Sequence, residues 1–133
     1  MLHVEDRKLK MDWKILIIVV GVVVAFFALK RLSFVSAEEA RKHLAAGALV
    51  IDVRSPDEFR SGHLTNAVNI PLGELQERIP DFVKDKNQVL LLHCLSGGRS
   101  AIARQQLKRM GYGNAFNLGS FRRARQIVSD SRD

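Results

Sequence analysis

The sequence contains a single cysteine, Cys94, among its 133 residues. One cysteine cannot form a disulfide within the chain, so no disulfide framework supports the fold. Histidine, cysteine, aspartate and glutamate also do not cluster anywhere with the spacing of metal ligands. We therefore expect neither a metal ion nor another cofactor, and any chemistry must come from the side chains and the backbone.

The excess of basic over acidic residues is also small outside the N-terminal segment. The formal net charge is +7, but beyond residue 31 fifteen basic residues stand against eleven acidic ones, a net charge of +4. No basic stripe with interleaved aromatic residues is present, so we expect no nucleic-acid partner. Arg122, Arg123 and Arg125 form a basic face near the C-terminus. We expect this face to be solvated, with contact to anionic lipid headgroups as the alternative.

Polar side chains are absent from residues 15–29. A helix of that length spans about 22 Å, which is short for a hydrocarbon core of about 30 Å. Trp13 and the basic residues on either side extend the usable length, because they can lie at the membrane interface. We predict one membrane-spanning helix over residues 13–31, preceded by a short tail over residues 1–12.

A cleavable signal peptide is the competing interpretation, because Val35-Ser36-Ala37 resembles a cleavage site. However, Lys30 and Arg31 separate the apolar run from that site, and Ser36 and Glu39 have the spacing of a helix capping box. We favour a single-pass membrane anchor. Four basic residues lie near each end of the helix, so the side of the membrane that carries the domain stays open.

Beyond the anchor, apolar runs alternate with helical segments. The pattern predicts strands at residues 32–35, 48–53, 67–70, 89–93 and 115–118. It predicts helices at residues 37–46, 56–61, 72–79, 81–84, 100–110 and 120–128. Strands that alternate with helices imply a parallel sheet covered on both faces. The prediction is therefore an α/β domain over residues 32–133, with three layers and a central parallel sheet flanked by helices.

Cys94 lies between the predicted strand at residues 89–93 and the glycine-rich segment at residues 95–100. A strand, a tight loop and a helix N-terminus bring backbone N–H groups together, and the helix dipole favours negative charge there. A thiolate in such a cradle has a lowered pKa and becomes a nucleophile. A buried structural cysteine is the simpler alternative, but it needs neither the glycine pair nor Arg99.

Three segments of the chain carry a family resemblance. Residues 94–100 (CLSGGRS) resemble the active-site loop of rhodanese-like sulfurtransferases. Residues 52–64 (DVRSPDEFRSGHL), followed by residues 67–71 (AVNIP), are similar to a second motif of that family. Residues 111–119 are similar to its ending. The resemblance covers residues 34–128, and it implies a rhodanese-like fold.

The resemblance also implies an activity. Sulfane sulfur would pass from a small anionic donor, thiosulfate or a persulfide, to a thiol or cyanide through a persulfide on Cys94. The loop N–H groups would hold the anion, and Arg99 would bind the donor or offset the persulfide charge. The implied catalytic residue is Cys94, and the implied substrate-binding residues are Leu95, Ser96, Gly97, Gly98, Arg99 and Ser100. The physiological donor and acceptor, including any protein acceptor, stay open.

Structural roles near the site are expected for four further residues. Asp52 and Arg54 match family positions, and we expect an ion pair or a loop-bracing network that includes Glu58. His63 is expected to bond a backbone group rather than to act as a base. His93 precedes Cys94 on a strand, so its side chain should point away from the Cys94 side chain.

Two other functions stay open at this stage. His93-Cys94 followed by Arg99 is similar to a phosphatase signature, although four residues rather than five lie between Cys94 and Arg99. The shorter loop makes a smaller cradle, and no aspartate is clearly placed as the general acid for an alcohol leaving group. Arsenate reduction would also need a larger anion pocket. The second alternative is a non-catalytic, membrane-tethered module that binds a partner.

Overall fold

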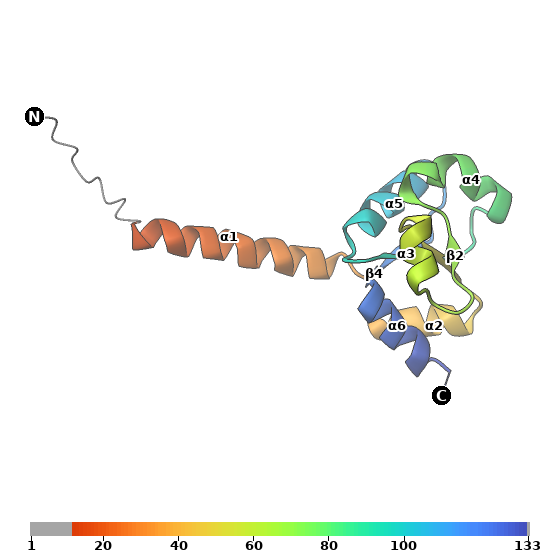
Figure 1. Ribbon diagram of the computed structural model, residues 1–133, viewed down its shortest axis with the longest axis horizontal. Coiled ribbons are helices and arrows are strands. Elements are labelled where there is room, and N and C mark those ends of the chain that lie inside the picture. The colour runs from red at the N-terminus through yellow and green to blue at the C-terminus, as the bar shows by residue number, and fades with distance from the viewer. Residues whose placement is uncertain (1–11, 133) are drawn as a thin grey trace, which may run out of the picture. The chain divides into compact units, whose positions relative to one another are not determined.

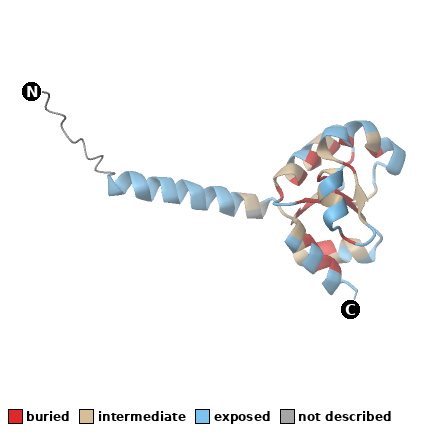
Figure 2. Cartoon of the chain, in the orientation of Figure 1, coloured by how far each residue is buried: buried red, intermediate tan, exposed pale blue. Residues whose placement is uncertain are grey.

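The computed structural model describes residues 12–132, which belong to two compact units divided between residues 32 and 33. Most of the predicted tail over residues 1–12 lies outside the described residues. Within the first unit, α1 (Trp13–Leu32) is a single helix. Its residues 13–29 are exposed on all sides and are drawn pale blue in Figure 2. By length and composition, α1 could cross a membrane, and a signal sequence would pass the same test.

A four-stranded parallel sheet forms the centre of the second unit (Figure 1), in the order β2-β1-β3-β4. Its strands are β1 (Leu49–Asp52), β2 (Val68–Asn69), β3 (Leu90–Cys94) and β4 (Ala115–Ser120). Every residue of β3 is buried, which fits the continuous apolar run that predicted it. The register of β3 against β4 shifts between Leu92 and His93, next to the residue that carries the thiol.

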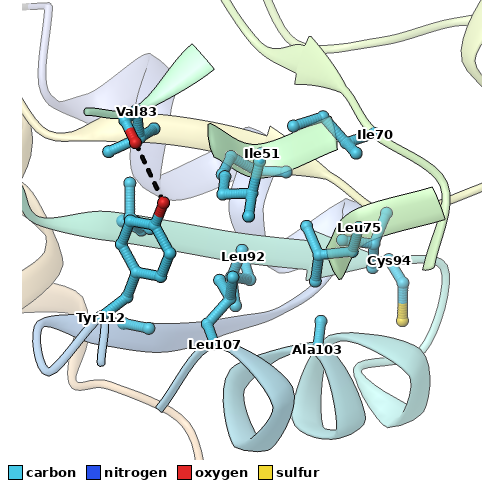
Figure 3. Packing of buried hydrophobic residues seen from close by; sticks show 13 residues of the cluster. Ile51, Ile70, Leu75, Val83, Leu92, Cys94, Ala103, Leu107 and Tyr112 are labelled. Carbon is cyan, nitrogen blue, oxygen red and sulfur yellow. Dashed lines mark hydrogen bonds between the residues drawn. The ribbon is translucent and has the colours of Figure 1, made fainter. Parts of the chain in front are cut away.

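Helices cover both faces of this sheet. The described helices of this unit are α2 (Ala37–Ala45), α3 (Pro56–Ser61), the 3₁₀ turn η1 (Leu72–Glu74), α4 (Leu75–Phe82), α5 (Gly98–Arg109) and α6 (Phe121–Asp130). Side chains of α4 and α5 pack with Leu92 and Cys94 on one face, as Figure 3 shows. Side chains of α2 and α6 pack with Leu91 on the other face. This alternation along β3 produces the predicted three layers.

Hydroxyl caps fix where the helices that flank the site begin. The Ser55 hydroxyl accepts a hydrogen bond from the Glu58 N–H, and the Glu58 carboxylate accepts one from the Ser55 N–H, which is a complete capping box. Ser36 and Ser120 cap α2 and α6 in the same way through their hydroxyls. The box matters for the site because it orients the Glu58 side chain.

Two predicted elements are wrong in detail. The first strand, expected at residues 32–35, is reduced to an isolated bridge between Phe34 and Asn117, because α1 continues to Leu32 and α2 is already capped at Ser36. Pro80 lies inside α4 instead of separating two helical pieces. The missing proline N–H removes one helical hydrogen bond, and α4 ends soon after it, at Phe82.

The predicted basic face near the C-terminus is correct only in part. Arg122 and Arg125 are exposed. Arg123 is half-buried and donates to the carbonyl oxygens of Val35 and Leu118, with its guanidinium 5.5 Å from the centre of the Phe34 ring. The expectation of a fully solvated face was wrong for Arg123, because its long side chain folds back over the start of the domain.

Candidate active site

Cys94 is the last residue of β3, at the carboxyl end of the sheet, and α5 begins four residues later at Gly98. Gly97 reverses the chain between them with φ +92°, in the left-handed region that disfavours residues with a Cβ. The first N–H groups of a helix have no acceptor within that helix, so the turn aims unpaired donors at the strand end. Sequence and structure agree on this geometry.

Backbone and hydroxyl donors surround the Cys94 sulfur. The Gly97 N–H lies 3.0 Å from Sγ, and the Ser100 hydroxyl oxygen lies 3.6 Å from it. The side chain is fully buried, with 0% of its surface exposed. In Figure 3 the sulfur points toward the N-terminal end of α5 and away from the side chains at the centre of the core.

These donors change the acidity of the thiol. Burial alone would raise the pKa of Cys94, because it penalises the charged form. The Ser100 N–H and hydroxyl and the N–H groups of Gly97 and Ser96 stabilise the thiolate, and together they bring the pKa below its ordinary value. A purely structural buried cysteine would show the opposite shift, so this environment favours the interpretation as a nucleophile.

Asn117, to which the sequence analysis gave no role, connects β4 to the Cys94 loop. Its amide donates to the Gly97 carbonyl at 3.1 Å, and its side-chain oxygen accepts from the Ser100 hydroxyl at 2.8 Å. The same oxygen accepts the Gly119 N–H at 3.0 Å. Asn117 therefore fixes both ends of the turn. A polar residue in the middle of the otherwise apolar strand predicted at residues 115–118 was the signal that could have identified it.

The Phe34 ring packs against the same turn. A Cβ on Gly97 would lie 2.7 Å from Cζ of the Phe34 ring, and one on Gly119 would lie 3.2 Å from Cδ2 of that ring. Both positions therefore need glycine for space as well as for a positive φ. Phe34, three residues before the start of α2, thus supports the loop that carries the nucleophile, a contact that no local sequence pattern indicated.

Arg99 and Glu58 form a bidentate ion pair between α5 and α3. Arg99 Nη1 donates to Glu58 Oε1 at 2.7 Å, and Nη2 donates to Oε2 at 2.9 Å. Arg99 holds the pKa of Glu58 at about 2, well below its usual range. The expected network of Glu58 with Asp52 and Arg54 is corrected here, because the capping box turns the Glu58 carboxylate toward α5.

Asp52 and Arg54 form the ion pair that was predicted. Arg54 Nη2 lies 2.7 Å from Asp52 Oδ2 and also donates to the Gly62 carbonyl at 2.7 Å. The Asn69 amide donates to the carbonyl oxygens of both residues at 2.9 Å. Since Gly62 ends α3, this buried network holds α3, and with it Glu58, against the strand ends.

Both histidines near the site have structural surroundings. The His63 Nδ1 lies 2.8 Å from the Phe59 carbonyl oxygen, so His63 bonds a backbone group as predicted. His93 is buried on the opposite face of β3 from Cys94, stacked against Phe121 and 3.7 Å from Asp52 Oδ2. Burial lowers the pKa of His93, and the nearby Asp52 charge opposes that effect.

The remaining predicted loop residues line the rim of the turn. Leu95 is 58% exposed, and its carbonyl accepts the Phe121 N–H at 3.3 Å. Ser96 is exposed and Gly98 is half-buried. No cluster of three possible metal ligands occurs within residues 12–132. The described residues thus combine a stabilised thiolate, an anion cradle and a charged pair, which suits nucleophilic group transfer.

Comparisons with known proteins agree with this chemistry. The family model for the rhodanese-like domain matches residues 36–123. Thiosulfate sulfurtransferase PspE of Escherichia coli (strain K12) is 40% identical over 72 residues, which make up 54% of this chain and 69% of the relative. Because the match to the family model includes the β3–α5 loop, the similarity to the family extends over the candidate site as well as the sheet.

The fold is also similar to solved structures of sulfurtransferases and rhodaneses. The human single-domain sulfurtransferase TSTD1 is 30% identical with a TM-score of 0.61, over 71% of this chain and 96% of that one. A rhodanese with anions from E. coli is 38% identical with a TM-score of 0.56, over 58% of this chain and 91% of that one. The fold of the second unit is therefore that of single-domain sulfurtransferases.

Replacing Gly97 tests how the turn is held. Gly97→Ala adds a Cβ at φ +92° and against the Phe34 ring, whereas Gly47→Ala adds one at φ +91° with nothing within 4 Å. We expect Gly47→Ala to lower the free energy of unfolding by about 1–2 kcal/mol, from backbone strain alone. Gly97→Ala should cost about 1–3 kcal/mol more, from overpacking, when both are measured by denaturant unfolding.

The same experiment has an internal check. Phe34→Ala in the Gly97→Ala background should restore part of the extra loss, since it removes the ring that the new Cβ meets. Equal costs for Gly97→Ala and Gly47→Ala would contradict the close contact between Phe34 and the turn.

Proposed function

The chain belongs to the rhodanese-like domain family, and we propose that it transfers sulfane sulfur through a persulfide on Cys94. The observation that carries the proposal is the set of donors around Sγ: the Gly97 N–H at 3.0 Å, with the Ser96 and Ser100 groups beside it. These donors stabilise negative charge on sulfur, which is present on the attacking thiolate and again on the persulfide. The named relatives and structural neighbours are sulfurtransferases.

In the first half-reaction, the Cys94 thiolate attacks the outer sulfur of the donor. With thiosulfate, a bond forms between Sγ and the outer sulfur, the sulfur–sulfur bond of thiosulfate breaks, and sulfite leaves with the electron pair. With a persulfide R–S–SH, the leaving group is the thiolate RS⁻ and the proton stays on the transferred sulfur. Either way, Cys94 becomes a persulfide without an external oxidant, because the leaving group takes the electron pair of the broken sulfur–sulfur bond.

In the second half-reaction, a thiolate or cyanide attacks the outer sulfur of the Cys94 persulfide. The bond to Sγ breaks, the thiolate of Cys94 is restored, and the acceptor leaves as a persulfide or as thiocyanate. The donors from Ser96, Gly97 and Ser100 stabilise the thiolate that is released. Two half-reactions on one nucleophile predict ping-pong kinetics.

We also propose that α1 anchors the domain in a membrane. The helix has 20 residues, enough to approach the thickness of a hydrocarbon core, and its apolar side chains are exposed on all sides. No side of α1 offers a polar face to water, which distinguishes it from an amphipathic surface helix. The sulfur-transfer domain would then work on one side of a membrane, tethered by residues 13–31.

Mass spectrometry of the intact full chain tests the sulfur-transfer proposal. In mild detergent, incubation with thiosulfate or with an alkyl persulfide should add the mass of one sulfur atom, and cyanide should remove it. Cys94 is the one cysteine of the chain, so Cys94→Ser should gain no sulfur. Ser131→Ala, which alters an exposed hydroxyl near the C-terminus, should load like the wild type.

Failure of both donors to load the wild-type chain would overturn the proposal and favour a module that only binds a partner. Hydrolysis of an aryl phosphate that depends on Cys94, without sulfur loading, would favour the phosphatase alternative instead.

The anchor is tested by charges placed within α1. The double variant Val20→Lys/Val23→Lys places two charges near the centre of the helix. Each charge raises the free energy of membrane insertion by about 2.5–3.5 kcal/mol. The wild-type chain should stay in the membrane pellet after alkaline carbonate washing, and the double variant should move to the supernatant. Ile102→Lys, on an exposed position of α5, should fractionate like the wild type. A wild-type chain shortened at its N-terminus would instead show a cleaved signal peptide.

A further inference from the structure

Arg99 was expected to bind an anionic donor, yet its side chain already holds an anion. Both of its terminal nitrogens donate to the Glu58 carboxylate, at 2.7 and 2.9 Å. Glu58 is fixed in turn, because its Oε1 accepts the Ser55 N–H at 3.2 Å within the capping box of α3. The fork geometry that would bind an anionic donor is therefore occupied by a carboxylate of the chain itself.

The pair lies next to the nucleophile. The pKa of Arg99 is raised, first by its hydrogen bonds to Glu58 and also by the charge of Cys94. Arg99 is the second residue of α5, in the turn that follows Cys94, and the side chains of Arg99 and Glu58 are 38% and 32% exposed, while Cys94 is fully buried. The charges of Arg99 and Glu58 therefore contribute to the electrostatic potential that a donor meets near Cys94.

The charges at this position can be counted. Glu58 has a pKa of about 2, so it is ionised at any working pH, and it cancels the charge of Arg99. With the Cys94 thiolate, the three side chains carry one negative charge. A small dianion such as thiosulfate is repelled unless it displaces Glu58 from Arg99. The transferable sulfur of an alkyl persulfide carries at most one negative charge, and the neutral R–S–SH form carries none.

We propose that Glu58 is a specificity-determining residue that disfavours small dianionic sulfur donors and makes the persulfide of a thiol the preferred donor. The inference rests on the proposed sulfur transfer through Cys94. Glu58 acts through Arg99 and through the local potential, and it takes no part in bond making or breaking. In the favoured reaction, the bond between the two persulfide sulfurs breaks, RS⁻ leaves with the electron pair, and Sγ gains the outer sulfur.

Glu58→Gln tests the inference in the full chain. Glutamine keeps one oxygen, which can accept from the Ser55 N–H and from Arg99 Nη1 as Glu58 Oε1 does, and it replaces the charged second oxygen by an amide group, so the capping box and the fold should be retained. Single-turnover sulfur loading of Cys94 is followed by intact mass with two donors, thiosulfate and 2-hydroxyethyl persulfide. The second-order rate constant for thiosulfate should rise about tenfold, and that for the persulfide, which carries at most one negative charge, should rise by about threefold or less.

Two further variants separate charge from shape. Asp57→Asn removes an exposed carboxylate from the same helix, one that pairs with Arg60, and should leave both rate constants within twofold of the wild type. Glu58→Asp keeps the charge while shortening the side chain, and should keep the wild-type ratio of the two donors. Added salt should narrow the difference between wild type and Glu58→Gln, since screening weakens the potential of a half-exposed charge.

If Glu58→Gln leaves the ratio of the two rate constants unchanged, or raises both rate constants equally, the proposed role of Glu58 is overturned while sulfur transfer through Cys94 still stands. Loss of loading with both donors in the wild type is a different result, because it would overturn the proposed function itself.

Discussion

The structure of the domain depends on one junction, where β3 ends at Cys94 and α5 begins at Gly98. Backbone N–H groups there have no helical acceptor and face a sulfur atom that is cut off from water. Burial and hydrogen bonding have opposite effects on a thiolate, and at this junction the hydrogen bonds dominate. The surrounding sheet and helices keep the donors in place without the reorganisation that water would require.

A second set of contacts holds Glu58 and Arg99 in place beside the Cys94 loop. The Asp52–Arg54 pair ties the end of β1 to the end of α3. The capping box at the start of α3 orients Glu58, which then holds Arg99 beside Cys94. A stretch of chain that is distant in sequence from the nucleophile thus sets the charge in front of it. The role that we propose for this stretch is selection among donors rather than bond making or breaking.

The sequence predicted most of the fold and the centre of the site, because both follow local patterns. The apolar run of β3, the glycine turn and the helix after it are contiguous, so the anion cradle around Cys94 could be inferred from spacing alone. The contacts of Phe34, Glu58 and Asn117 with the loop connect distant segments, and periodicity carries no information about them. The partner of Glu58 was therefore assigned wrongly, and Asn117 received no role.

The hydrogen bonds of the cradle lower the pKa of Cys94 although the thiol is buried. The most direct test of this lowered pKa is the rate of alkylation of the full chain by iodoacetamide as a function of pH, with Cys94→Ser as the blank. We predict an inflection below the ordinary thiol pKa of about 8.5, and a shift of that inflection to higher pH in Ser100→Ala, which lacks one donor. An inflection at or above the ordinary value in the wild type would show that burial outweighs the hydrogen bonds, and would contradict the account.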